Sequence, residues 1–133
     1  MKSLENVFLE TNLVDFAHMI QSDEDCKQFL VEYKWKEGFE CHKCHHTAFQ
    51  ERKDHSRTCN KCSYTESPTA HTIFHKVKFG LTKSFFIAFE YFKYKNVDTT
   101  SISKIYDIRK STAAHFVKKL EKVHCLNPNC TCH

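Results

Sequence analysis

Four of the eight cysteines form two Cys-x-x-Cys pairs that lie close together in the chain. The first pair is Cys41 and Cys44, and the second is Cys59 and Cys62. Two such turns, separated by a hairpin-length insert, can bring four thiolates around one ion in the closed tetrahedral arrangement of a structural zinc site. We therefore expect these four cysteines to bind one structural Zn²⁺ ion.

Cysteine pairs of this kind have other uses. A thioredoxin-type redox site needs only one pair, at a strand-to-helix turn of a larger α/β domain, and no such context is visible. The N-terminus lacks a signal peptide and no apolar run is long enough to span a membrane, so we expect a cytoplasmic protein without disulfides. A rubredoxin-like iron site uses similar ligands, and spacing alone does not distinguish iron from zinc.

Histidines are the other candidate ligands. His42, His45, His46 and His55 lie near the cysteine pairs, but four thiolates already complete a site, so we expect these imidazoles to face solvent. The C-terminal stretch offers a second ligand set, and the sequence leaves a second metal site open there. Its residues are His124, Cys125, Cys130, Cys132 and His133.

Positive charge is concentrated in the second half of the chain. The formal net charge is +4, yet residues 1–40 carry four basic and nine acidic side chains, whereas residues 76–122 carry eleven basic and four acidic ones. Such a basic segment behind a zinc module favours a polyanionic partner, and double-stranded DNA is the first candidate. Lysines that merely solvate helix surfaces are the alternative.

The first half of the chain predicts a short helix followed by a small sheet. Ser22 is a suitable N-cap for an amphipathic helix with three acidic residues in its first turn, and Gly38 ends that segment. The stretch 63–80 alternates enough to predict extended chain that completes the sheet and leads away from it. We therefore expect an N-terminal helical segment over 1–38 and a zinc ribbon of β-hairpins over 39–79.

The second half predicts three helices. Phenylalanines recur at helical spacing after Gly80, which indicates a core-facing stripe. A second helix begins at Thr99 or Thr100, a turn follows over Asp107–Lys110, and a third helix carries another apolar stripe. A short turn before the last of three helices matches a helix-turn-helix-like module, here over 80–123, and 124–133 forms a Cys/His-rich tail. The predicted fold class is therefore α+β.

The third helix and the turn before it supply the candidate DNA contacts. The N-terminal residues of the second helix of a helix-turn-helix meet base edges, and later basic residues contact phosphates. The candidate base readers are Arg109, Lys110, Ser111, Thr112 and His115. The candidate phosphate contacts are Lys118, Lys119 and Lys122.

Three stretches, KWKEGFECHKC, RTCNKCSYTESPTAHTIFHKVKFGLTKSFF and SISKIYDIRKSTAAHFVKKL, resemble the N-terminal region of bacterial insertion-sequence transposases with a later DDE-type catalytic domain. The most specific portion runs from Thr69 to Lys78. The resemblance implies a bacterial, nucleoid-associated protein that binds DNA at the ends of such an element.

The sequence departs from that family pattern at several turn positions. Lys36 and His42 stand where proline is usual, His45 and Asp107 where glycine is usual, and Arg109 where a capping serine is expected. Glu121 is the last acidic residue, so we expect no DDE site and no enzymatic activity. The alternative function is a protein-interaction adaptor, or a regulatory subunit, whose Phe-rich helix and ribbon dock a separate transposase subunit or a second copy.

Overall fold

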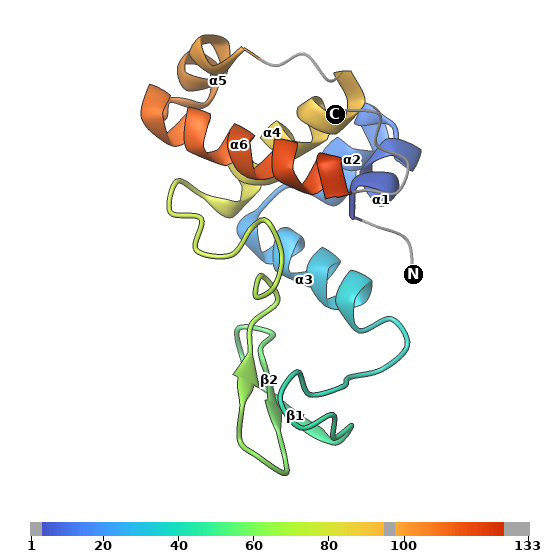
Figure 1. Cartoon of the computed structure of the whole chain (residues 1–133). Coiled ribbons are helices and arrows are strands. Elements are labelled where there is room, and N and C mark those ends of the chain that lie inside the picture. The colour runs from blue at the N-terminus through green and yellow to red at the C-terminus, as the bar shows by residue number, and fades with distance from the viewer. Residues whose placement is uncertain (1–3, 95–97, 127–133) are drawn as a thin grey trace. The chain divides into compact units, whose positions relative to one another are not determined.

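The chain forms two compact units in the computed structural model (Figure 1). The model describes residues 4–94 and 98–126, and for residues 123–126 it describes the backbone alone. The cysteine unit comprises Ser22–Lys76, and the helical unit comprises Met1–Gln21 together with Val77–His133. The cysteine unit is therefore an insertion in the helical unit, which takes its residues from both ends of the chain. The N-terminal segment predicted over 1–38 is divided between the two units.

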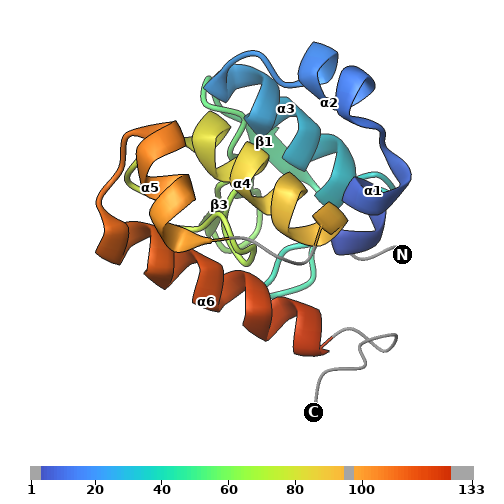
Figure 2. The same cartoon turned by 90° about the horizontal axis from the view of Figure 1, so that it is seen from above.

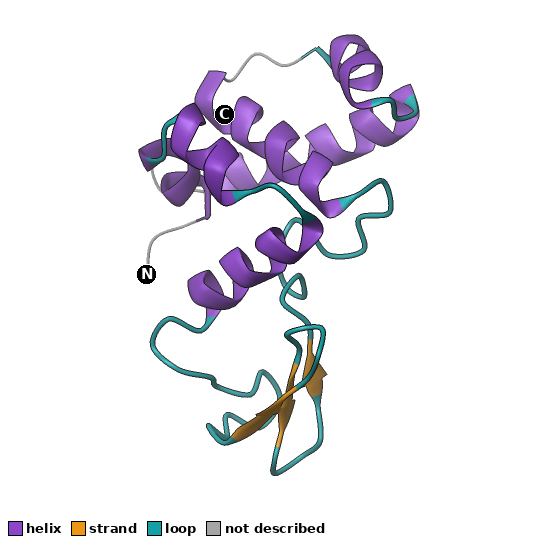
Figure 3. Ribbon diagram, turned by 180° about the vertical axis from the view of Figure 1, so that it is seen from behind, coloured by secondary structure: helices purple, strands orange, loops and turns teal. Residues whose placement is uncertain are grey.

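The fold class is α+β, as predicted, with six helices and a three-stranded antiparallel sheet in the described residues (Figure 3). The helices are α1 (Leu4–Glu10), α2 (Leu13–Met19), α3 (Asp23–Lys34), α4 (Leu81–Tyr94), α5 (Thr99–Tyr106) and α6 (Lys110–Leu126), and the strands are β1 (Phe49–Glu51), β2 (Arg57–Cys59) and β3 (Thr65–Glu66).

Aromatic packing around α4 holds the helical unit together. Helices α1 and α6 pack on α4, and α5 packs on α6 (Figure 2). Phe16 of α2 stacks on Phe89 with ring centroids 4.3 Å apart, and Phe8 of α1 lies 5.8 Å from Phe85. Because these four rings are buried, α1 and α2 belong to the core, although the helical segment predicted over 1–38 was expected to contain only the one helix that starts after Ser22.

The predicted apolar stripes on α4 and α6 are confirmed. Phe85, Phe89 and Phe92 are buried on α4. The buried side chains of α6 are Ala113, Phe116, Val117 and Leu120. Helix α5 begins at Thr99 as predicted, with Asp98 as its N-cap, and the turn over residues 107–109 separates it from α6.

The cysteine unit begins with the predicted helix. The Ser22 hydroxyl accepts a hydrogen bond of 3.2 Å from the Asp25 amide, which satisfies one free N–H at the start of α3. Strand β2 lies between β1 and β3, and Phe49 pairs with Cys59 in the first antiparallel register. The strand β3 thus completes the sheet as predicted.

The prediction of extended chain over 63–80 is wrong beyond Glu66. Residues 67–76 form successive turns, because hydroxyl side chains offer the backbone local hydrogen bonds that compete with an extended conformation. The Ser67 carbonyl and hydroxyl both accept from the Ala70 amide, each at 3.2 Å. Thr72 donates its hydroxyl to the Thr69 carbonyl at 2.6 Å.

Candidate functional site

The structure brings the four predicted cysteines together. Cys41 Sγ lies 3.5 Å from Cys62 Sγ, and Cys44 Sγ lies 3.5 Å from Cys59 Sγ. All four sulfur atoms lie within 4.8 Å of one another. Sulfurs at the corners of a tetrahedral site with Zn–S bonds of about 2.3 Å would be about 3.8 Å apart. The geometry therefore fits a metal ion held by four thiolates.

The two cysteine loops have the same backbone structure. In the first, the Cys41 amide donates to the His46 carbonyl and the His45 amide donates to the Cys41 carbonyl, both at 2.9 Å. In the second, the Cys59 amide donates to the Tyr64 carbonyl at 2.9 Å and the Ser63 amide donates to the Cys59 carbonyl at 3.0 Å. His45 and Ser63 occupy equivalent positions, and both have φ of 64°. Each loop thus presents its two sulfurs in the same way.

The first cysteine of each loop ionises readily. Burial opposes ionisation of Cys59, but hydrogen bonds from the amides of Cys62 and Lys61 and from neighbouring thiols outweigh it and lower its pKa to about 6. Cys41 behaves alike, because the equivalent amides of its own loop overcome the effect of burial and lower its pKa. Thiolates are the form that binds a metal, so these two positions favour binding.

Cys44 shows why a cation is needed to ionise the whole group. The His46 amide favours its thiolate, but burial and the hydrogen bonds with the other three sulfurs outweigh that effect and raise the pKa of Cys44 to about 12. Four negative sulfurs at this separation repel one another, and a bound metal ion removes the repulsion.

A small apolar core supports the cysteine loops. Cys41 and Cys59 are buried against Trp35 and Phe39. The Arg57 guanidinium lies over two rings, 4.5 Å from the centroid of Trp35 and 4.2 Å from that of Phe49. Since burial outweighs the opposing effect of a nearby carboxylate, the pKa of Arg57 is lowered.

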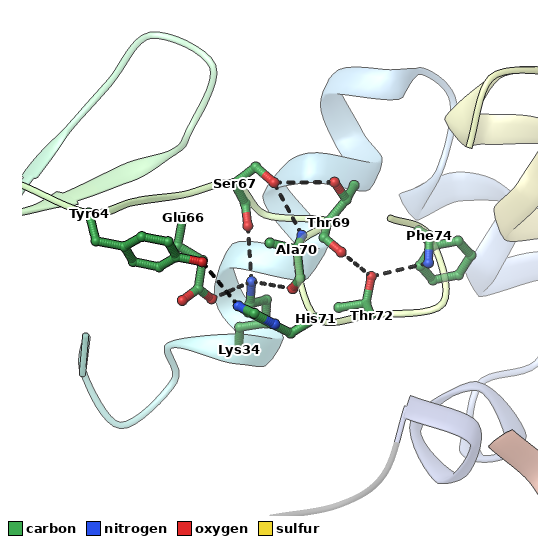
Figure 4. Close-up of polar contacts among 9 residues, drawn as sticks. All are labelled: Lys34, Tyr64, Glu66, Ser67, Thr69, Ala70, His71, Thr72 and Phe74. Carbon is green, nitrogen blue, oxygen red and sulfur yellow. Dashed lines mark hydrogen bonds and ion pairs between the residues drawn. The ribbon is translucent and has the colours of Figure 1, made fainter. Parts of the chain in front are cut away.

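Lys34 connects α3 to the turn that follows the sheet (Figure 4). Its Nζ lies 2.6 Å from the Glu66 carboxylate and donates to the carbonyls of Ser67 and Ala70 at 2.9 and 2.8 Å. Burial lowers the pKa of Lys34, and Glu66 opposes that shift. The sequence did not predict this network, because nothing in the spacing pairs Lys34 with a residue so far along the chain.

The histidines near the cysteines are not part of the four-thiol group. Among the described residues, the one cluster of metal-ligating side chains contains cysteines alone. His45 is exposed and lies 3.0 Å from the Glu40 carboxylate. His55 contacts Glu24, and His42 stacks on His71.

The predicted DNA contacts divide into an exposed stripe and its flanks. Ser111, His115, Lys118 and Lys122 are exposed and follow one another at intervals of four, three and four residues, which places them on one face of α6. We call these four residues the α6 stripe. This face lies opposite the buried residues of the same helix.

The flanking candidates have different surroundings. Arg109 and Lys110 are exposed at the start of α6, whereas Thr112 and Lys119 are half-buried. The second set of candidate ligands, His124, Cys125, Cys130, Cys132 and His133, lies outside the residues whose side chains the structure describes.

No known family model, curated protein or solved structure matches this chain. No helix within the described ranges is long and apolar enough to cross a membrane.

Proposed function

We propose that this chain is a duplex-DNA-binding protein in which a zinc ribbon stabilises the cysteine unit and a helix-turn-helix presents α6 to the major groove. The observation that carries the proposal is the α6 stripe. It puts two lysines, a histidine and a serine on the solvent face of a helix that follows a tight turn. Such a face can enter the major groove with its N-terminal residues toward the bases.

The distribution of charge between the two units supports this role for α6. The helical unit carries eleven Lys and Arg against seven Asp and Glu, whereas the cysteine unit carries nine of each. The whole positive excess therefore belongs to the unit that contains the stripe. Lys118 and Lys122 would contact phosphates, and Arg109, Lys110, Ser111 and His115 would meet base edges.

Zinc is the metal that suits the four-thiolate group best. Closed Cys₄ sites of this spacing are typical of structural zinc, and the cysteine unit has only a small core to hold it together. Bound zinc would fix the two cysteine loops and thereby the sheet that joins them. The resemblance to insertion-sequence transposases adds a candidate target, the end of a mobile element, for a chain that binds without catalysing transposition.

Fluorescence anisotropy of the zinc-loaded protein on random duplex DNA across a salt series tests the proposal. Affinity should fall steeply as salt rises, because bound lysines displace counterions. The Lys118→Ala/Lys122→Ala variant should shift the slope of log affinity against log salt by about 2. The matched control Lys36→Ala/Lys53→Ala removes the same charge from exposed positions of the cysteine unit and should leave the slope unchanged.

The second candidate is the protein-interaction adaptor. Leu13 and Val14 on α2 support it, since their side chains are 52% and 66% exposed. The Phe-rich helix does not support it, because Phe85, Phe89 and Phe92 are buried in the helical unit. Failure to bind duplex DNA even at low salt would overturn the DNA-binding proposal and favour the adaptor.

A further inference from the structure

Two exposed imidazoles from distant parts of the sequence stack on each other in the cysteine unit. His42 lies in the first cysteine loop, and His71 lies in the turn region after the sheet. Their ring centroids are 3.9 Å apart and the rings are inclined by 21°. Each ring covers one face of the other, so the outer faces form an exposed aromatic surface.

The surrounding fold fixes this pair. The Tyr64 hydroxyl lies 3.2 Å from His71 Nε2 (Figure 4), and the Tyr64 ring packs on the core around the cysteines. The Tyr64 carbonyl also accepts the hydrogen bond from the Cys59 amide. His71 has φ of 63°, a left-handed conformation that glycine and, to a lesser extent, asparagine adopt more easily than most residues. The hydrogen bond with Tyr64 therefore orients His71, and the ring of His42 stacks on it.

A cation lies over the Tyr64 ring, which contacts His71. Lys43 Nζ is 5.3 Å from the centroid of the Tyr64 ring, and Lys43 is exposed. Glu40, the acidic residue just before the first loop, is engaged by His45. We call His42, Lys43, Tyr64 and His71 the imidazole platform, and it combines aromatic faces with a positive charge and no carboxylate.

We propose that the imidazole platform binds single-stranded nucleic acid, with one unpaired base stacked on the histidine pair and an adjacent phosphate at Lys43. An unpaired base has a free aromatic face, whereas the bases of a duplex are already stacked on each other. Aromatic surfaces beside basic side chains are the usual means of binding single strands. This site uses none of the residues of the α6 stripe and does not depend on duplex binding.

The test compares the affinity of the zinc-loaded full chain for a fluorescent strand of eight thymidines with its affinity for a strand of eight abasic nucleotides. The two strands carry equal charge, so a difference between them measures contacts with the bases. We expect the thymidine strand to bind roughly tenfold more tightly. An eight-uridine strand distinguishes RNA from DNA as the source of the base.

The variant His42→Ala/His71→Asn should abolish the preference for bases. Asparagine is chosen because it tolerates the left-handed backbone of residue 71, and the thiolate absorption of the cobalt-loaded protein confirms that the unit is folded. The controls His18→Ala and Lys53→Ala, at exposed positions that are not part of the platform, should behave like the parent.

Three results would overturn the proposal. They are equal affinity for the thymidine and abasic strands, an unchanged preference in the folded double variant, and loss of the preference in Lys118→Ala/Lys122→Ala. The last result would place the strand on the α6 stripe. The failure of this proposal can be distinguished from the failure of the duplex-binding proposal. Single-strand binding is tested with His42→Ala/His71→Asn, and duplex binding is tested with Lys118→Ala/Lys122→Ala.

Discussion

Lys34 and Glu66 form a buried ion pair, with 2.6 Å between Nζ and Oε2 and only 10% and 6% of their side chains exposed. The lysine also donates to two carbonyls of the turn after the sheet, so all three of its N–H groups have acceptors. Burial lowers the pKa of Lys34 despite the neighbouring carboxylate, which indicates that desolvation opposes the charge of the pair. Such a pair specifies the position of a turn more than it adds net stability.

The substitution Lys34→Met should therefore destabilise the cysteine unit by about 3–5 kcal/mol, because Glu66 is left buried without its partner. Fluorescence of Trp35, the only tryptophan, reports this unit during guanidinium unfolding of the zinc-loaded protein. The double variant Lys34→Met/Glu66→Leu should regain a large part of the lost stability. A double variant no more stable than Lys34→Met would refute this account of the pair.

Metal affinity should rise with pH, because binding requires four thiolates. The pKa of Cys44 is about 12, so this residue must release a proton when the metal binds at neutral pH. Each released proton increases the apparent affinity about tenfold per pH unit. Below about pH 6, protonation of Cys59 adds to the effect, and the loss of affinity becomes steeper. Competition with a colorimetric chelator from pH 5 to 8 measures this slope, and a flat profile would contradict it.

The four-cysteine cluster and most of the local structure were predictable because they depend on short-range signals. The spacing of Cys41, Cys44, Cys59 and Cys62 fixes which sulfurs meet, and Ser22 marks the start of α3 through its own side chain. These signals act within a few residues, where backbone geometry leaves few alternatives.

The helices α1 and α2 could not be predicted in the same way. Each has seven residues, too short for a periodic stripe, and they are ordered by contacts such as that of Phe16 with Phe89, far along the chain. The imidazole platform is likewise a long-range arrangement, since His42 and His71 meet only after the turns over 67–76 have formed. Tertiary packing, which single-sequence patterns do not encode, decides both features.

Replacement of His45 by glycine should stabilise the cysteine unit by about 0.5–1 kcal/mol. His45 has a left-handed backbone at the end of the first cysteine loop, and an L side chain there costs about 1–2 kcal/mol, partly offset by the greater entropy of unfolded glycine. Guanidinium unfolding followed by Trp35 fluorescence measures the increase in the free energy of unfolding of the cysteine unit. The control variant His18→Gly, in the helical unit, should not increase it.

Removal of the metal should loosen α1 and α2, although neither helix contains a ligand. The cysteine unit is inserted between α2 and α4, so its unfolding converts residues 22–76 into a flexible loop. Closing such a loop costs about 3–4 kcal/mol. Amide hydrogen exchange should therefore accelerate at least tenfold in α1 and α2 after chelation and return when zinc is restored. Unchanged exchange there would show that the helical unit folds independently of the insertion.

Arg109 provides a final prediction in which stability and binding change in opposite directions. It occupies the N-cap position of α6, since its carbonyl accepts from the Ala113 amide at 2.9 Å, and arginine is a poor cap. Arg109→Ser should raise the stability of the helical unit by about 1 kcal/mol and weaken duplex binding by about 1–3 kcal/mol, the loss expected for a residue that contacts a base edge. Arg109→Gln should cause the same loss of binding without the gain in stability. If both variants bind DNA like the parent, Arg109 lies outside the interface. The serine variant is expected to be more stable than the parent, so unfolding could not explain a loss of DNA binding in that variant.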